Sequence, residues 1–378
     1  MRTRSRRRRG PSCPGWTLDS AGDGFFPSED TARVRLLVEL TLENEALARA
    51  EALATRELLT GSSRLDGVAV GPGVVAFSGS RSLARRLGAR LGLARRVSRL
   101  IAVGDARAVI RGASRTRLSG SFAIRPHFLT PGGDARALDR LVRATGDSMR
   151  EACPGAKVEL ESPSTEFPLL SSGGINWFGE TLSEVGRSEI HSRDPQRRRL
   201  DRPIGMAAKY ARALVNLARV RKGDVVLDPF CGSGGILLEA ALAGARPVGI
   251  DIDAAVLRIA DATVRRYSPA VTTRLIEGDS EDAPALLRRA RVGRVAAVVT
   301  DLPYGRSTRV AGRTKREIAS ILVSSSAKLL MPGARLVATT DSPGELERSA
   351  ARNFRIEERF SLFVHRSLTR HIFVMARR

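Results

Sequence analysis

The stretch VVLDPFCGSGGILLEA, residues 225–240, decides the fold class of this chain. Its apolar start predicts a short buried strand that ends at Asp228, and its apolar end predicts a helix. Between them, Asp-Pro and three glycines predict a tight turn in which the backbone can approach a ligand closely. The helix would present free N–H groups and the positive end of its dipole to that ligand. The stretch therefore predicts a strand–turn–helix unit with a binding site at the turn.

The spacing of the glycines separates this turn from a dinucleotide-binding turn. A dinucleotide fingerprint reads G-x-G-x-x-G, whereas Leu237 stands here in place of the third glycine. The pattern favours S-adenosylmethionine, with the turn backbone and a carboxylate near the methionine ammonium. The alternative is a β–α turn with a purely structural role. We assign the cofactor contacts of this turn to Asp228, Pro229, Phe230, Gly232 and Gly234.

From residue 204 onward, apolar runs alternate with segments of helical periodicity. Strands separated by helices predict an α/β domain with a parallel, doubly wound sheet. In that architecture, ligands bind at the carboxyl ends of the strands. The expected strands cover 224–228, 246–252, 272–279, 294–301 and 334–341, and the expected helices cover 206–220, 234–244 and 254–267.

Carboxylates follow two further expected strands. In GIDID (249–253), we expect Asp251 to accept both ribose hydroxyls of the cofactor, with Ile252 beside it. Asp253 is expected to cap the next helix instead. In EGDS (277–280), we expect Asp279 to accept a hydrogen bond from the adenine amino group, with Ser280 beside it. The alternative for this last carboxylate is an ordinary surface loop.

The sequence TDLPYG (300–305) follows another expected strand and predicts the place of chemistry. An exocyclic amino group on a base is a poor nucleophile because its lone pair is delocalised into the ring. Asp301 and the carbonyl of Leu302 would accept its hydrogens and so direct the lone pair at a methyl donor. Pro303 would fix the turn, and Tyr304 would offer a face on which a flipped base stacks. A plain Pro-Tyr-Gly turn is the alternative.

Together these motifs resemble the amino-methylating, S-adenosylmethionine-dependent methyltransferases with a Rossmann-like fold. More narrowly, residues 202–240, 301–307 and 365–375 resemble the archaeal tRNA (guanine-10-N2)-methyltransferases. That resemblance implies methylation of N2 of a tRNA guanosine, once or twice. The family motif often reads Asp-Pro-Pro-Tyr, and Leu302 replaces the first proline here, although its backbone carbonyl remains available.

The resemblance also implies a domain organisation. Residues 34–59 and 90–101 fit a ferredoxin-like domain, expected over 31–105, and strands near 121–127 and 157–167 fit a THUMP RNA-binding domain, expected over 106–170. A linker is expected over 171–200 and the methyltransferase domain over 201–378. Residues 1–30, rich in Arg, Pro, Gly and Ser, are expected to be a disordered tail.

Charge supports a nucleic-acid partner, tRNA under this resemblance. The net charge of the 378-residue chain is +23, and without the six arginines of its first ten residues it is still +17. Genome composition alone can also produce such an arginine bias. The expected RNA contacts are Arg306, His365, Arg366 and Arg370, for which a solvated sheet edge is the alternative.

The remaining composition narrows the class of protein. Three cysteines lie far apart without a CxxC pair, so no zinc site or disulfide framework is indicated and a cytoplasmic location is expected. No apolar run reaches membrane-spanning length. We expect a monomer that needs neither membrane nor metal.

Other functions remain open at this stage. The same chemistry would serve another tRNA guanosine, guanine N2 in rRNA, or adenine N6. A non-catalytic RNA-binding protein with an inactive methylase domain is a further alternative, against which the four motif residues Asp228, Asp251, Asp301 and Tyr304 argue. A THUMP-linked sulfur-transfer enzyme is disfavoured because we find neither an adenylation loop nor paired cysteines.

Overall fold

A computed structural model describes residues 33–65, 67–198, 205–303 and 312–378 of the protein. The arginine-rich tail predicted over 1–30 lies outside these residues. By its packing, the chain divides into two compact units. The first contains Leu65–Ala84 and Ser98–Leu182 together with the residues up to Val38. The second contains Glu39–Arg64, Arg85–Val97 and Ser183–Arg378.

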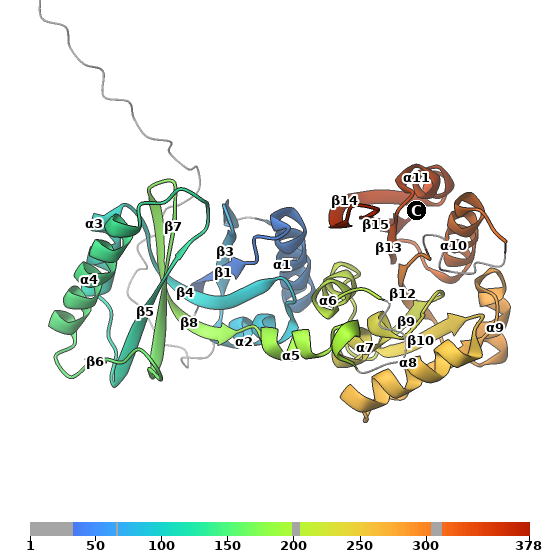
Figure 1. Cartoon of the computed structure of the whole chain (residues 1–378), viewed down its shortest axis with the longest axis horizontal. Coiled ribbons are helices and arrows are strands. Elements are labelled where there is room, and N and C mark those ends of the chain that lie inside the picture. Colours follow the sequence, from blue (N-terminus) through green and yellow to red (C-terminus); the bar gives the residue numbers. More distant parts are fainter. Residues whose placement is uncertain (1–32, 66, 199–204, 304–311) are drawn as a thin grey trace, which may run out of the picture. The chain divides into compact units, whose positions relative to one another are not determined.

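An eight-stranded sheet has the strand order β2-β3-β1-β4-β8-β7-β5-β6 (Figure 1). Strand β5 pairs in parallel with β6 and β7, whereas β7 pairs with β8 in antiparallel fashion. The strands are β1 (Val34–Leu40), β2 (Ala69–Gly71), β3 (Val74–Gly79), β4 (Ala94–Gly104), β5 (Ser121–Phe128), β6 (Lys157–Val158), β7 (Thr165–Ser172) and β8 (Ile175–Glu184). The helices of this half of the chain are α1 (Glu45–Thr60), α2 (Arg81–Arg90), α3 (Ala106–Ser114), α4 (Ala135–Ala152) and α5 (Arg187–Ser192), followed by the 3-10 turn η1 (Pro195–Arg197).

The first unit has apolar residues packed on both faces of this sheet. Helices α3 and α4 place Val109, Leu138 and Met149 against the buried rings of Phe122 and Phe167. The opposite face carries a second cluster that includes the fully buried Trp177. Helix α3 was not expected from the sequence.

The expected linker over 171–200 contains regular structure instead. Its residues Ile175–Glu184 form β8, which lies between β4 and β7 in the sheet. Trp177 packs in one apolar cluster and Phe178 in the other, so this strand is buried on both faces. Such a strand lacks the apolar–polar alternation by which a half-exposed strand is recognised. The boundaries of the ferredoxin-like and THUMP domains stay a prediction.

The second unit contains a seven-stranded sheet with the order β11-β10-β9-β12-β13-β15-β14. Its first five strands are parallel, and β15 joins them antiparallel to β13. The doubly wound sheet predicted from the sequence is therefore present, extended by a C-terminal hairpin. The strands are β9 (Val225–Asp228), β10 (Arg246–Asp251), β11 (Arg274–Glu277), β12 (Val295–Asp301), β13 (Arg335–Thr340), β14 (Phe354–His365) and β15 (Leu368–Arg377).

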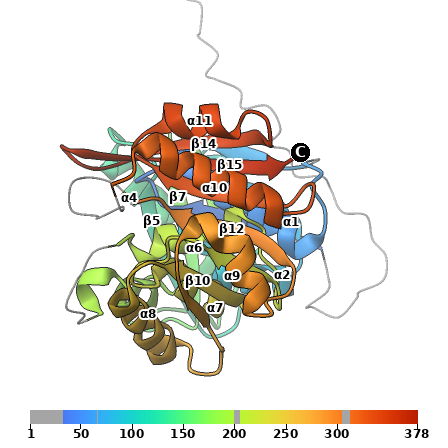
Figure 2. The same ribbon diagram turned by 90° about the vertical axis from the view of Figure 1, so that its right-hand side faces the viewer.

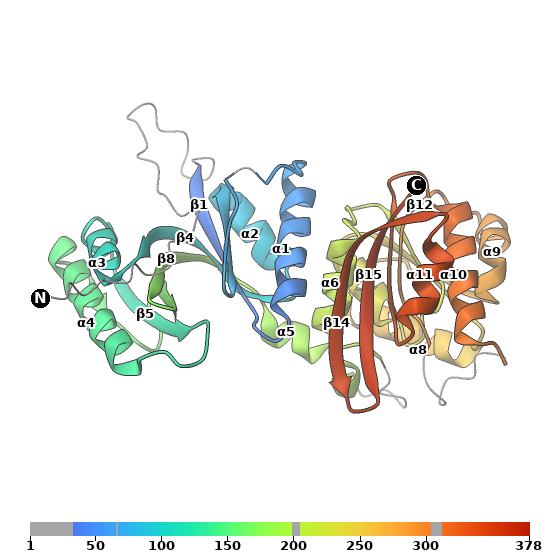
Figure 3. The ribbon, with the colours of Figure 1, turned by 90° about the horizontal axis from the view of Figure 1, so that it is seen from above.

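Helices cover both faces of this sheet. Helices α9, α10 and α11 contribute to one large apolar cluster, and α7 and α8 to another. Figure 3 shows β14 and β15 between α6 on one side and α10 and α11 on the other. The helices are α6 (Ala208–Leu217), α7 (Gly235–Leu242), α8 (Ala254–Tyr267), α9 (Ala283–Arg289), α10 (Lys315–Leu329) and α11 (Pro343–Ala350), with the 3-10 turn η2 (Ser280–Asp282) before α9.

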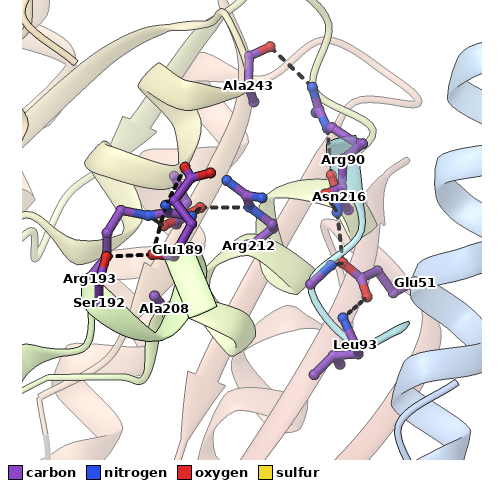
Figure 4. Close-up of polar contacts among 12 residues, drawn as sticks. Glu51, Arg90, Leu93, Glu189, Ser192, Arg193, Ala208, Arg212, Asn216 and Ala243 are labelled. Carbon is purple, nitrogen blue, oxygen red and sulfur yellow. Dashed lines mark hydrogen bonds and ion pairs between the residues drawn. The ribbon is translucent and has the colours of Figure 1, made fainter. Parts of the chain in front are cut away.

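Helix α1 also belongs to the second unit, where a buried polar network joins it to α6 (Figure 4). The fully buried carboxylate of Glu51 accepts hydrogen bonds from the amide of Asn216 at 2.7 Å and from the backbone N–H groups of Gly92 and Leu93 at 2.8 Å. The side chain of Arg90 donates to Asn216 at 2.6 Å. Burial raises the pKa of Glu51 and lowers that of Arg90 to about 10. Helix α2 ends at Arg90, and the backbone just beyond it, at Gly92 and Leu93, donates these bonds to Glu51.

Candidate active site

Four adjacent strands bring the predicted carboxylates to one edge of the second sheet. Strands β11, β10, β9 and β12 are neighbours, and their carboxyl ends carry or precede Asp279, Asp251, Asp228 and Asp301, respectively. Because the strands are parallel, all four carboxyl ends lie at the same edge. The structure thus brings together the three strand-end carboxylates that the sequence singled out, with Asp279 in the loop beyond β11.

The glycine turn has the backbone conformation that the sequence implied. Gly232 and Gly234 have φ angles of 49° and 79°, which favour glycine. A side chain at Gly234 would also lie 3.0 Å from Ala260 of α8, whereas the space beside Gly232 is open. Pro229 is buried beneath the turn, and Phe230 packs against the core. The turn therefore leaves room for a ligand on the side of Gly232.

The turn is held to the next strand by Asp251. Its Oδ2 accepts a hydrogen bond from the N–H of Gly232 at 3.0 Å, and its Oδ1 accepts one from the N–H of Asp253 at 3.1 Å. Burial raises the pKa of Asp251. Asp253 caps α8 through Ala255 and Val256, as the sequence predicted. The neighbouring side chain of Ile252 is 50% exposed, which leaves an apolar surface beside the carboxylate.

Asp228 is the most deeply buried carboxylate of the site. Its Oδ1 accepts hydrogen bonds from the hydroxyl of Thr300 at 2.6 Å and from the N–H of Phe230 at 3.1 Å. Burial raises the pKa of Asp228 to about 7, and the nearby charges of Asp301 and Asp251 add to the effect. Within the described part of the chain, neither Asp228 nor Asp251 forms an ion pair. A cationic ligand would therefore find negative charge here that lacks a counter-charge.

Asp279 and Ser280 are engaged with protein groups. Asp279 caps η2 through the N–H of Glu281 and forms an ion pair with Arg313 at 2.8 Å, which contributes to lowering its pKa against the opposing effect of burial. Ser280 is buried, and its carbonyl accepts a hydrogen bond from Ser325. Their contacts with adenine and the cofactor stay a prediction.

Asp301 lies at the end of β12 and contacts two other strands. Its Oδ1 accepts a hydrogen bond from the hydroxyl of Thr339 on β13. Its Oδ2 lies 3.5 Å from the guanidinium of Arg370 on β15. Arg370 was expected to contact RNA phosphates, but it is buried in the sheet. The arginine faces the carboxylate at the strand end, and its contact with RNA stays a prediction.

The other residues of the catalytic motif are placed in part. Leu302 is buried in the core, and its N–H donates to the carbonyl of Thr339 at 3.0 Å. Pro303 is half-buried. Tyr304 and Arg306 lie outside the described residues, so their roles in base stacking and RNA contact stay predictions.

His365 and Arg366, the other two expected RNA contacts, are exposed at the turn between β14 and β15. Thr340, the last residue of β13, pairs with His371, so the hairpin turn continues beyond the carboxyl end of that strand. Figure 2 shows the turn protruding beside the seven-stranded domain. Phe363, near the end of β14 and close to this turn, is 70% exposed and was not predicted from the sequence.

Three polar partners of the carboxylates were not predicted from the sequence: Thr300, Thr339 and Arg313. Thr300 directly precedes Asp301 in the quoted motif, but its hydroxyl donates a hydrogen bond to Asp228 of the neighbouring strand. Thr339 stands at the end of an expected strand, where a polar residue at a ligand-binding edge is a usable signal. Nothing in the local pattern marks Arg313.

These residues fit S-adenosylmethionine. The ligand carries an ammonium and a sulfonium, and the site offers the carboxylates of Asp228 and Asp251 without ion-pair partners in the described chain. The glycine turn and the N-terminus of α7 provide N–H donors. Ile252 offers an apolar surface for the adenosine. No cluster of potential metal ligands occurs within the described residues.

The fold and this site define a Rossmann-like methyltransferase. A family model described as an RMKL-like methyltransferase domain matches residues 195–372. A tRNA (guanine(10)-N2)-dimethyltransferase of Methanothermobacter thermautotrophicus is 31% identical over 348 residues, which are 91% of this chain and all of that protein. The chain belongs to the family of tRNA (guanine(10)-N2)-dimethyltransferases and is an enzyme.

Two further comparisons agree with this assignment. A dimethyltransferase of the same name from Pyrococcus abyssi is 29% identical over 296 residues, covering 76% of this chain and 85% of that protein. The crystal structure of TrmN from Thermus thermophilus aligns with a TM-score of 0.57 at 22% identity, covering 91% of this chain and all of that chain. At this identity, the second likeness supports the fold alone.

Among the described residues, no helix has the length and apolar character needed to cross a bilayer.

Proposed function

We propose that this enzyme transfers methyl groups from S-adenosylmethionine to N2 of guanosine 10 in tRNA. The observation that carries the proposal is the alignment of Asp228, Asp251 and Asp301 at one edge of the methyltransferase sheet. The family relationship supplies the target nucleotide. Because the relatives are named dimethyltransferases, we expect both hydrogens of N2 to be replaced in turn.

Each carboxylate has a distinct task in this proposal. S-adenosylmethionine, when bound, supplies an electrophilic methyl group on a sulfonium. Asp228 holds the cationic end of the ligand, and Asp251 accepts the ribose hydroxyls. Asp301 accepts a hydrogen of the target amino group and relays its proton to solvent after transfer. Alignment of the amino nitrogen with the methyl group in a water-poor site supplies most of the acceleration.

A basic cavity in the first unit supports binding of an RNA backbone. This cavity has a volume of about 540 Å³ and lies between β4 and α3. Its charged lining consists of Arg99, Arg111, Arg115 and Arg117. Arginines bind phosphates through bidentate hydrogen bonds, so this cavity suits the sugar–phosphate backbone expected of a THUMP-type domain.

The β14–β15 turn supports a second RNA contact, close to the site of chemistry. Exposed Phe363 offers a ring on which an unpaired base can stack, and His365 and Arg366 can contact the adjoining phosphates. The turn extends past the strand end that is paired with His371, at the same edge of the sheet as Asp301.

The substrate assignment is tested with labelled S-adenosylmethionine and an unmodified tRNA transcript, followed by digestion and identification of the nucleoside. We expect N2-methylguanosine at early times and N2,N2-dimethylguanosine later. A transcript with adenosine at position 10 serves as the matched control and should remain unlabelled. Methyladenosine in the first transcript, or equal labelling of the second, would overturn the assignment.

The roles of the residues are tested with Asp301→Ala. This variant should bind S-adenosylmethionine within about twofold of the native affinity in calorimetry, yet lose turnover. Retained turnover would refute the role of Asp301. Complete absence of label in the native protein, with RNA binding intact, would favour an inactive methylase domain that serves only in RNA binding.

The enzyme acts as a cytoplasmic monomer under this proposal. The reducing cytoplasm suits the buried free thiols of Cys153 and Cys231. Light scattering of the purified protein with and without tRNA measures the mass directly. A stable dimer in both samples would contradict the predicted monomeric state.

A further inference from the structure

Arg370 is a buried arginine that faces the carboxylate of Asp301. It lies on β15, its side chain is 9% exposed, and its Nη2 is 3.5 Å from Oδ2 of Asp301. The hydroxyl of Thr339 on β13 donates to the other oxygen, Oδ1. The two oxygens of one carboxylate are thus held by groups from two different strands.

A second, deeply buried carboxylate, that of Asp228, lies near Asp301. The charges of Asp228 and Asp301 interact, and both burial and this interaction raise the pKa of Asp228. Like charges favour the protonated form of a carboxyl group. A protonated Asp301 would carry an O–H on one oxygen and would donate a hydrogen bond where the reaction needs an acceptor. A cation at Asp301 offsets this repulsion.

We propose that Arg370 is a positioning residue for methyl transfer: its guanidinium keeps Asp301 ionised and fixes Oδ2, so that the carboxylate accepts the hydrogen of the target amino group. The inference rests on the proposed function, because it assumes that Asp301 contacts that amino group. It gives two further strands a role in catalysis: β13, which pairs with β12, supplies the Thr339 hydroxyl, and β15, which pairs with β13, supplies the charge.

Two other roles for Arg370 make different predictions. A phosphate contact would affect the affinity for RNA, but the arginine is buried and faces the carboxylate. A purely structural ion pair would affect stability and would lower activity equally at every pH. A positioning role affects the turnover number chiefly at low pH, where Asp301 would otherwise become protonated.

The test measures kcat between pH 6 and pH 9 at saturating cofactor and tRNA for Arg370→Met and Arg370→Lys. The matched control is Arg355→Met, which removes an equal charge from the exposed side chain of β14 that pairs with Glu357. In Arg370→Met, the acid limb of kcat should move upward by about one to three pH units, because an opposite charge shifts a carboxyl pKa by that amount. Most of the lost turnover should return toward pH 9.

Arg370→Lys retains the charge, so its acid limb should stay within about half a pH unit of that of the native enzyme. The control variant should keep the native profile. The dissociation constant for tRNA should change less than twofold in Arg370→Met. Thermal unfolding of each variant is recorded, and if the methionine variant does not fold, the comparison of the lysine variant with the control decides.

An unshifted acid limb in folded Arg370→Met overturns the proposal, as does a displaced limb in Arg370→Lys equal to that of the methionine variant. Weakened tRNA binding with an unchanged pH profile identifies a phosphate contact instead. The variant Asp301→Ala distinguishes a failure of the role proposed for Arg370 from a failure of the proposed function. If that variant is inactive while Arg370→Met is native-like, the role of Asp301 stands and only the role of Arg370 falls.

Discussion

Replacing Asp228 by asparagine should stabilise the free protein and strongly weaken cofactor binding. Both hydrogen bonds to this side chain, from Thr300 and from the N–H of Phe230, end on Oδ1. Asparagine retains an acceptor at Oδ1, so the local geometry is kept while the buried charge is removed. The variant therefore isolates the cost of the charge.

The magnitude follows from the pKa of Asp228, which burial raises from 3.8 to about 7. A group whose pKa is higher in the folded state contributes its stability at low pH and loses it as the pH rises through that pKa. At pH 8, the ionised carboxylate costs the folded state about 4 kcal/mol relative to the unfolded chain. Asp228→Asn should recover up to about this amount at pH 8, and about 1 kcal/mol less at pH 6.

Urea unfolding of both proteins at pH 6 and pH 8 measures the two differences in the free energy of unfolding. Calorimetry with S-adenosylmethionine should show binding to the native protein and a loss of at least about 100-fold in the variant, because a buried charge partner is removed. A variant that is less stable than the native protein at pH 8 would refute the reasoning. So would equal affinity for the cofactor in the two proteins.

Three other predictions follow from the same structure. The affinity of the native protein for S-adenosylmethionine should fall about eightfold from pH 7.5 to pH 6 in calorimetry, because a carboxyl group with a pKa of about 7 must give up its proton to hold a cation; a flat profile would contradict this. Gly234→Ala should lower the free energy of unfolding by about 1–3 kcal/mol, since its φ of 79° and the contact at 3.0 Å both oppose a side chain, whereas Gly293→Ala, where the space is open, should change it by less than about 0.5 kcal/mol in the same urea titration. Asn216→Ala should cost about 2–4 kcal/mol in the same assay because it removes the side-chain partner of the buried Glu51 carboxylate; a loss below about 0.5 kcal/mol would show that water replaces the amide.

The parts of the fold that follow local rules could be predicted from the sequence. The turn after β9 was predicted because positive φ angles at Gly232 and Gly234 restrict the residue type. The cap of α8 was predicted because Asp253 precedes its own helix. By contrast, residues 175–184 were expected to lie in a linker because they resemble the linker of the family, whereas they form β8, which is buried on both faces. The local sequence of a strand does not show which distant residues pack against its two faces.

The sequence by itself determined the chemical class of the site. The succession of strands along the chain and the residue at the end of each strand are local features that the sequence shows directly. It placed Asp228, Asp251 and Asp301 at strand ends, and parallel pairing then had to bring them to one edge. Only the tertiary structure decided which groups form hydrogen bonds and ion pairs with those carboxylates. Arg370 reads in the sequence as one more basic residue of a basic chain, yet the antiparallel pairing of β15 with β13 carries it to Asp301. A strand's partner and register depend on packing across the whole sheet, and for that reason the role of this arginine could not be predicted from the residues around it.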